Sequence, residues 1–179
     1  IQESIEKLHE AINKINKEGV TRLKDAYKIV NENFERLFTK LFGGGKAYLK
    51  LLQNDEDPLN SGLEIFASPP GKKMQNITLL SGGEQALTAI SLLFAVFMAN
   101  PSPFCILDEV DAPLDDNNVD RFCSMVEEIS EKVQTKFIII THNRMTMSRV
   151  DRLYGVTMPE EGISQIVSVE LEEAVKYAE

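Results

Sequence analysis

The sequence has few of the side chains on which disulfide-linked and zinc-binding proteins depend. Its 179 residues include two cysteines, Cys105 and Cys123, and two histidines. Both cysteines lie among apolar residues without CxxC spacing, so we expect buried thiols rather than a disulfide or a pair of metal ligands. The shortage argues against a disulfide-stapled or zinc-stabilised fold.

Positive charge and long hydrophobic runs are also scarce. The 19 Lys and Arg residues are outnumbered by 28 Asp and Glu, which gives a net charge of −9 and argues against a broad basic face for nucleic acid on this chain alone. DNA contact would need a local patch or another chain. The most apolar run, 86–99, is too short to span a bilayer and suits a buried helix. We therefore expect a soluble intracellular protein with no membrane contact, of the size of one domain.

Apolar residues in the first 42 positions predict a long amphipathic helix. Ile5, Leu8, Ile12 and Ile15 follow the heptad spacing of a coiled coil. The same spacing continues from Val20, but its register slips by one residue across 17–19. We interpret 1–42 as a coiled-coil end and neck helix, with a bend or a change of packing partner at the slip. The alternative is one surface helix of an ordinary domain.

Residues 43–179 predict a second unit that alternates strands and helices. Gly43–Gly45 end the first helix, and strands are expected at 47–52 and 63–67. Further on, we expect helices at 83–99, 117–133 and 144–150, strands at 104–107, 137–141, 153–158 and 165–170, and a charged C-terminal helix. Buried strands that alternate with helices predict an α/β fold with a mainly parallel sheet covered on both faces.

Two carboxylates follow one of the expected buried strands. Phe104–Leu107 are apolar and lead directly into Asp108 and Glu109. A strand of this kind places its acids at the carboxyl edge of the sheet, where open α/β sheets bind ligands. There Asp108 could hold Mg²⁺ through water, and Glu109 could polarise or deprotonate an attacking water. The alternative is an acid pair that caps the next helix.

A glycine-rich segment precedes the expected helix at 83–99. Its sequence, Leu-Ser-Gly-Gly-Glu-Gln at 80–85, combines the Ser81 hydroxyl with two glycines at a helix N-terminus. Glycine lets backbone approach a ligand closely, and the free N–H groups of a helix start attract phosphate. Alternatively, Ser81 and Glu84 form an ordinary capping box. Both interpretations can hold together.

Together these motifs resemble the ATP-binding-cassette ATPases. The segment 80–85 is followed by a hydrophobic strand and the Asp-Glu pair, and 109–116 (Glu-Val-Asp-Ala-Pro-Leu-Asp-Asp) resembles the SMC branch more than the transporter branch. Segments 34–47, 141–144 and 151–158 are also similar to the C-terminal head segment of bacterial SMC proteins. The resemblance covers essentially the whole chain and is most specific over 80–158.

The resemblance implies a role for each motif in an ATPase head. Ser81, Gly82, Gly83, Glu84 and Gln85 would form the signature motif, which binds the γ-phosphate of ATP held by the opposite head. Asp108 would be the Mg²⁺ residue and Glu109 the catalytic residue. Asp115 falls in the D-loop, which crosses the dimer interface, and Pro113 replaces an alanine common there. His142 takes the switch position near the γ-phosphate; alternatively it only ends a strand and caps the next turn.

The sequence has no phosphate-binding P-loop of the form GxxxxGK[ST]. At Gly45-Lys46 the first glycine position holds Lys40 and the Ser/Thr position holds Ala47. Gly71-Lys72 fails in the same two places. The resemblance places the P-loop on an N-terminal head segment, separated in sequence by the coiled coil. We therefore expect a split or truncated head that does not turn over ATP alone.

The implied function is ATP-driven head engagement in chromosome condensation and segregation, in the cytoplasm and on the nucleoid. The implied partners are the N-terminal SMC head segment, a second SMC head in a homodimer, a kleisin subunit contacting 153–171, and DNA through the complete complex. One rival is a coiled-coil DNA-repair ATPase of the same superfamily. The other is a non-catalytic scaffold that only dimerises heads.

Overall fold

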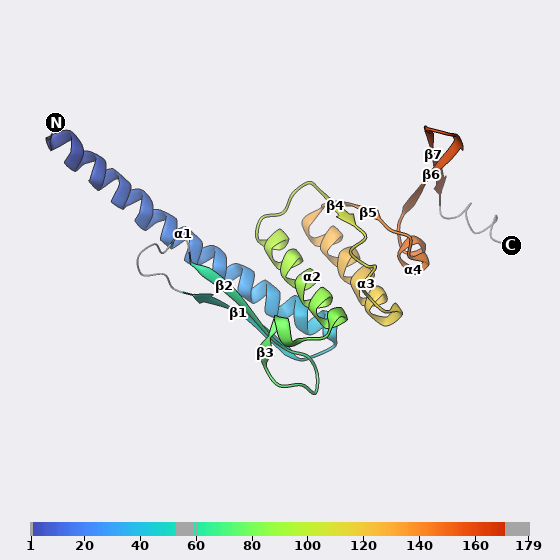
Figure 1. The fold of residues 1–179 in the computed structure, drawn as a ribbon, viewed down its shortest axis with the longest axis horizontal. Helices are drawn as coiled ribbons and strands as arrows, with labels where there is room; N and C mark the ends of the chain where they lie inside the picture. Colours follow the sequence, from blue (N-terminus) through green and yellow to red (C-terminus); the bar gives the residue numbers. More distant parts are fainter. Residues whose placement is uncertain (1, 53–58, 60, 171–179) are drawn as a thin grey trace.

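The computed structural model describes residues 2–52, 59 and 61–170, with twelve principal elements running from α1 to β7. Figure 1 shows a long helix leading into a body of helices and short sheets, with a hairpin projecting at the other end. The predicted charged C-terminal helix and most of the predicted acidic loop lie outside the described residues.

Helix α1 spans Gln2–Phe42 and changes its surroundings along its length. Its N-terminal apolar residues are exposed, Leu8 by 65% and Ile15 by 68%, whereas Phe34 and Phe38 are fully buried. The helix continues through Gly19, and burial begins there. Packing against the rest of the chain therefore begins near the predicted slip, whereas the predicted bend is absent because the helix continues unbroken.

The triglycine ends α1 and turns the chain into a strand. Gly43 has φ 67°, and Gly44 N–H donates to Thr39 O over 2.8 Å, as in a left-handed helix C-terminus. A side chain on Gly45 would collide with the carbonyl oxygen of Ser68. Arg121 donates to Leu41 O over 3.1 Å and satisfies a terminal carbonyl of the helix.

An antiparallel sheet packs beside the second half of α1. Its strands β1 (Lys46–Leu52), β2 (Gly62–Ser68) and β3 (Gln75–Asn76) lie in that order. Tyr48 pairs with Phe66 and stacks on it, with ring centroids 5.3 Å apart. Tyr27 of α1 donates a 2.5 Å hydrogen bond to Leu49 O, and Asn31 accepts the Leu49 N–H over 2.6 Å. These bonds attach the sheet to the helix.

The central layer contains a β-α-β unit. The short helix η2 (Ile77–Leu79) leads to α2 (Gly82–Ala99), then β4 (Phe104–Asp108), α3 (Asp116–Val133) and β5 (Lys136–Ile140). β4 and β5 are parallel, with Asp108 opposite Ile140. The predicted α/β class is confirmed. The predicted mainly parallel sheet is reduced to this pair in the described residues, because β1–β3 and the last hairpin are antiparallel.

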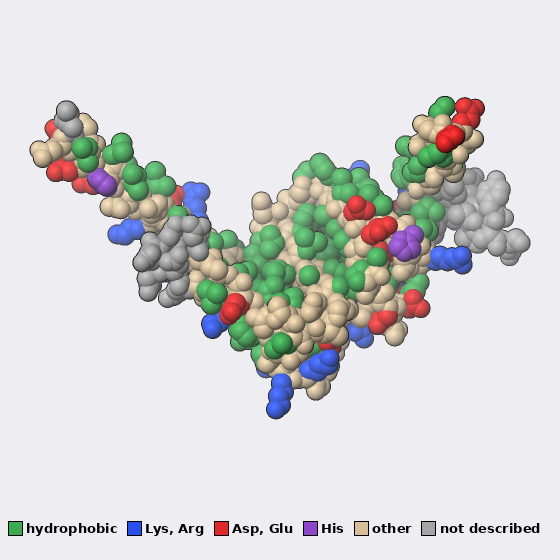
Figure 2. All heavy atoms as spheres, viewed as in Figure 1, with side chains coloured by type: hydrophobic (Ala, Val, Ile, Leu, Met, Phe, Trp, Pro, Cys, Tyr) green, Lys and Arg blue, Asp and Glu red, His purple; other side chains and the backbone are tan. Residues whose placement is uncertain are grey.

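The other difference concerns what covers the parallel pair. Its inward face includes Leu107, which is 3% exposed, whereas Phe104, Ile106, Ile138 and Ile140 are 50–58% exposed on the other face. Figure 2 shows hydrophobic side chains gathered over the middle of the molecule. Strands with continuous apolar runs are normally covered on both faces. Within the described residues the second cover is absent, so the prediction of two covered faces is wrong for this chain.

Helix α2 has the length and composition to cross a membrane, alone among the described helices. Six of its side chains are nevertheless buried in the core: Leu87, Thr88, Ile90, Ser91, Phe94 and Ala95. Its apolar character is therefore that of a core helix with a second, partly exposed side at Leu93 and Val96.

The last described elements form a short helix and a hairpin. They are α4 (Arg144–Ser148), β6 (Arg152–Glu160) and β7 (Ile163–Glu170), with β6 and β7 antiparallel. Figure 1 shows the hairpin standing away from the body. Tyr154, Val156 and Ile166 are 59–73% exposed.

Aromatic packing between α2, α3 and β5 provides the first testable prediction. Phe122 is fully buried, and its ring centroid lies 6.4 Å from that of Phe94. Because Phe122→Ala leaves a large cavity, we expect it to lower the free energy of unfolding by about 3–5 kcal/mol. Chemical denaturation measures this loss. Leu93→Ala, at a half-exposed α2 position, is the control and should cost less than about 1.5 kcal/mol. Equal losses would contradict this description of the core.

Candidate functional site

The segment before α2 is held by side chains of its own first turn. Ser81 has extended backbone at the N-cap, and the Glu84 carboxylate accepts its N–H over 3.1 Å and its hydroxyl over 2.8 Å. The Gln85 amide donates to Leu80 O over 2.9 Å. Glu84 and Gln85 therefore shape the start of the helix, and the predicted capping role of Ser81 and Glu84 is present.

Lys72 extends this arrangement from the loop between β2 and β3. Its ammonium lies 2.8 Å from Glu84 Oε1. The hydrogen bond from Lys72 holds the pKa of Glu84 below its ordinary value, against the raising effect of burial. Glu84 is therefore ionised at neutral pH, and its charge lies at the positive end of the α2 dipole. Sequence reasoning missed Lys72, because nothing in the sequence pairs a loop lysine with a glutamate twelve positions later.

Gly82 and Gly83 leave the start of α2 open. A Cβ on Gly82 would meet nothing within 4 Å, and one on Gly83 would meet Pro113 O at 3.8 Å. Neither glycine has a positive φ. Packing inside this chain therefore does not require glycine at 82, which is consistent with a backbone surface kept clear for a ligand. The Pro113 contact also places the acidic loop after β4 beside this helix start.

β4 brings the two predicted carboxylates to the edge of the parallel pair. Asp108 ends the strand, and the Glu109 N–H donates to Ile140 O over 2.9 Å. Glu109 has φ 48°, a left-handed conformation that costs a residue with a side chain about 1–2 kcal/mol. Such strain is retained where the direction of a side chain matters. Neither acid caps the next helix, because Asp115 does so by accepting Asn118 N–H over 2.9 Å.

His142 and Glu109 are brought together from two loops. The His142 Nδ1 atom lies 3.6 Å from Glu109 Oε1, and both side chains are largely exposed. The distance exceeds that of a hydrogen bond. His142 is not the cap of α4, because the Asn143 side chain accepts the Met145 N–H over 2.9 Å. The helix-capping roles that were the alternatives for Glu109 and His142 are therefore taken by Asp115 and Asn143.

The acidic edge has no positive partner of its own in the described part of the chain, because none of the ion pairs found there joins Asp108 or Glu109 to Lys or Arg. The same residues contain no group of three or more His, Cys, Asp or Glu side chains able to hold a metal. A lone Asp108 fits Mg²⁺ that is coordinated mostly by water and phosphate oxygens. This edge would repel a polyphosphate unless cations came from elsewhere.

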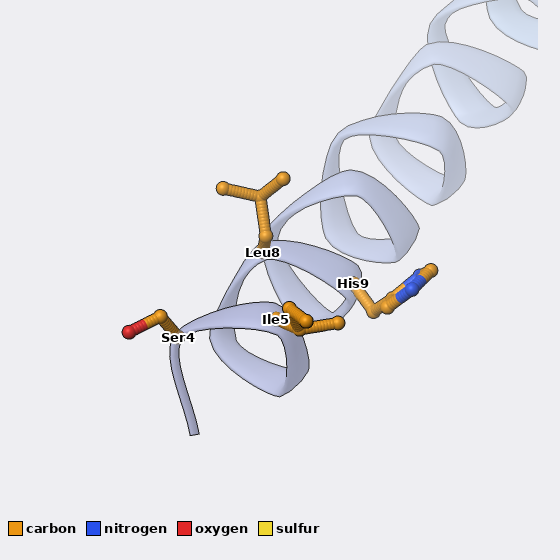
Figure 3. A pocket seen from close by; sticks show the side chains of 4 residues that line it. All are labelled: Ser4, Ile5, Leu8 and His9. Atoms are coloured by element: carbon orange, nitrogen blue, oxygen red, sulfur yellow. The ribbon is translucent and has the colours of Figure 1, made fainter. Parts of the chain in front are cut away.

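Two surface depressions are lined by none of the predicted site residues. The first lies at the start of α1 and is lined by Ser4, Ile5, Leu8 and His9. Figure 3 shows these side chains spreading from one helix, so the depression is part of the exposed heptad surface. The second lies between α2 and β4, where its lining includes Leu93, Val96 and Ile106. It belongs to the uncovered apolar face.

Asp111 was missed as a functional candidate. It is 1% exposed, and its Oδ2 atom accepts the hydroxyls of Thr141 and Thr146 over 2.7 Å and 2.5 Å. These two threonines lie on either side of His142. In the sequence Asp111 is one of several acids in a polar loop, and no local pattern marks it as the buried one.

Both cysteines are free thiols, and the predicted burial holds for Cys123 but only in part for Cys105. Cys123 is buried and Cys105 is partly exposed. Burial raises the pKa of both thiols, so neither is a thiolate at neutral pH.

The fold and the sequence of the chain together show the family to which it belongs. Residues 2–165 match the family described as the RecF/RecN/SMC N terminal domain, and the chain is a member of that family. Its α/β fold is that of SMC ATPase heads.

Individual relatives give the same result. The chain is 59% identical over 173 residues to the chromosome partition protein Smc of Rhodopseudomonas palustris, a match that covers 97% of this chain and 15% of the relative. Two solved structures are also similar. The first comes from work on ATP-driven dimerization and DNA-stimulated activation of SMC ATPases (39% identity, TM-score 0.77, 89% of this chain and 94% of the other). The second is the Smc head domain of Pyrococcus furiosus with an extended coiled coil, bound to the C-terminal domain of ScpA (42% identity, TM-score 0.79, 97% and 42%).

Proposed function

We propose that this chain is the C-terminal half of an SMC ATPase head and works in chromosome partition. The observation that carries the proposal is the combination of an open Leu-Ser-Gly-Gly-Glu helix start with the strained Glu109 at the end of β4. The head would bind and hydrolyse ATP once a second segment supplies the P-loop. Residues 1–42 would be the end of the coiled coil and the neck, and 43–179 the lobe of the head.

Two observations support the C-terminal assignment, although the matching family is described by its N-terminal domain. Residues 1–179 contain no GxxxxGK[ST] sequence. A P-loop runs from a strand through glycines into a helix, whereas Gly43–Gly45 join α1 to β1 in the opposite order. The assignment therefore rests on the motifs that this chain does and does not contain.

The uncovered face of β4 and β5 supports the need for a second segment. Four large apolar side chains, at 104, 106, 138 and 140, are at least half exposed there. Because they are already about half buried, covering the rest would contribute roughly 0.8–1.5 kcal/mol each, half of the value for burying a fully exposed side chain. We assign this face to the N-terminal SMC head segment, whose P-loop lysine would also offset the acidic edge at Asp108 and Glu109.

In the proposed reaction, water attacks the γ-phosphorus of ATP held by the completed head. Glu109 accepts the proton of that water, the bond between the γ-phosphorus and the β–γ bridging oxygen breaks, and ADP and inorganic phosphate leave. Mg²⁺, with Asp108 among its holders, would neutralise charge on the phosphates. Ser81 and the N–H groups of Gly82 and Gly83 would bind the γ-phosphate of ATP on the opposite head, joining two heads while ATP is intact. His142 and Asp115 would complete the interface between heads.

The remaining partners are proposed from one relative and from the charge of the chain. One similar head was solved with the C-terminal domain of ScpA, so we assign a kleisin-type subunit to the exposed hairpin β6–β7. DNA would be held by the complete complex, because the chain has a net charge of −9. We place this complex in the cytoplasm, on the nucleoid.

ATP hydrolysis with and without a P-loop segment tests the proposal. This chain would be co-expressed with the N-terminal head segment of the Rhodopseudomonas palustris Smc protein, and phosphate release measured over a range of complex concentrations. We expect turnover from the complex, rising more steeply than its concentration because two heads share each ATP, and none above background from the chain alone. Ile138→Asp on the uncovered face should prevent complex formation. Turnover by the chain alone, or a stable complex without turnover, would overturn the proposal.

A further inference from the structure

Asp111 is a buried carboxylate in the loop that follows Glu109. Its side chain is 1% exposed, and among the described residues it takes part in no ion pair. A buried charge is costly unless hydrogen bonds replace its hydration. Here the replacement comes from two hydroxyls, those of Thr141 and Thr146, both bonded to Oδ2.

The two threonines enclose the segment that carries His142. Thr141 immediately precedes His142, and its oxygen accepts the Asn143 N–H over 2.9 Å. Thr146 lies in α4 and is fully buried. The segment 141–146 is therefore attached at both ends to a single oxygen of Asp111.

The same residue is built into the loop that carries Glu109. Ala112 N–H donates to Glu109 O over 3.2 Å, and Leu114 N–H donates to Asp111 O over 3.1 Å. This tight turn follows the left-handed Glu109 directly. The backbone of Asp111 is thus part of the turn after Glu109, and its side chain is hydrogen-bonded to the segment that carries His142.

α4 is fixed at its far end as well. Arg149 follows the helix and donates to Glu127 Oε1 over 2.9 Å and to Asp120 Oδ1 over 2.6 Å, both on α3. These bonds hold the C-terminal end of α4 against α3. The segment before α4 is held by the hydrogen bonds to Asp111. Because Glu109 and His142 are exposed and lie 3.6 Å apart, they do not position one another by a hydrogen bond.

We propose that Asp111 is a positioning residue for the hydrolytic site, holding the His142 segment against the Glu109 turn through the hydroxyls of Thr141 and Thr146. The inference rests on the proposed function, in which Glu109 and His142 act at the γ-phosphate. Misplacing a catalytic group by about 1 Å can cost on the order of 100-fold in rate. Asp111 would therefore act on turnover without touching ATP.

The test uses the head complex formed with the P-loop segment. Thr141→Val with Thr146→Val removes both donors at nearly constant volume, and the matched pair Thr141→Ser with Thr146→Ser retains them. Asp111→Asn can keep its acceptor oxygen, whereas Asp111→Leu cannot. Steady-state kcat and KM for ATP, ATP-dependent dimerisation and Tm would be measured for each complex.

We expect the double valine variant and Asp111→Leu to lose at least about tenfold in kcat, with KM within about threefold and dimerisation retained. The double serine variant and Asp111→Asn should keep most of the activity. If Asp111→Leu fails to fold, the valine and serine pairs carry the test.

Three other outcomes overturn the inference. Unchanged kcat in the double valine variant would remove it while leaving the proposed function intact. A parallel fall of Tm, dimerisation and kcat would assign Asp111 to folding alone. A wild-type complex without turnover would overturn the proposed function, and this inference with it.

Discussion

Glu109→Gln is expected to abolish ATP turnover by the completed head, with a loss of at least about 100-fold in kcat. Glutamine keeps the size of the side chain and one acceptor oxygen but cannot accept the proton of the attacking water. The left-handed backbone at 109, with φ 48°, accommodates glutamine as it does glutamate. The loss should therefore be chemical rather than structural.

The same substitution should leave ATP-bound dimers intact and make them longer-lived. In the proposed cycle hydrolysis separates the heads, so ATP that is not hydrolysed keeps them joined. Phosphate release would be measured beside the mass of the complex with ATP, by size-exclusion chromatography with light scattering. Glu131→Gln on the exposed side of α3 is the control and should change neither quantity. Full activity of Glu109→Gln would favour a scaffold that only dimerises heads.

The backbone of this chain was largely predictable because distinctive residues mark where its helices and strands end. Glycine at 43–45 marked the end of α1, and the required left-handed conformations confirm that role. The apolar run at 104–107 followed by two acids predicted β4 and its edge position, and the structure pairs Asp108 with Ile140 there. These features depend on neighbours in sequence, which a local pattern can report.

Features that depend on distant contacts were not predictable. The apolar pattern of β4 and β5 predicted burial on both faces, but one face is exposed. A run of apolar residues shows that a strand needs to be covered. It does not show which chain covers it. The burial of Asp111 depends on two threonines at least thirty positions away. The bond from Lys72 to Glu84 likewise depends on how the loop after β2 folds back.

Ser81→Arg is the second substitution with a large expected effect, because it obstructs the surface proposed to meet the opposite head. Ser81 is exposed, and the adjacent Gly82 has open space around it. An arginine there would occupy the place of the γ-phosphate and could pair with Glu84, the present acceptor of the Ser81 hydroxyl. ATP would still bind to the P-loop segment, but the second head could not close over it.

The effect is sharpest in the presence of Glu109→Gln, where engaged dimers should accumulate. Adding Ser81→Arg to that variant should reduce the ATP-dependent dimer at least about tenfold, since one good charge-assisted hydrogen bond lost at an interface already costs roughly this much. Ser4→Arg, on the exposed first turn of α1, adds the same charge far from the site and should leave dimers unchanged.

Because Ser81 and Glu109 would serve different nucleotides, a mixture of the Ser81→Arg head with a Glu109→Gln head should still form one of the two shared sites. A Ser81→Arg dimer as abundant as its Glu109→Gln parent would show that α2 does not face the partner head.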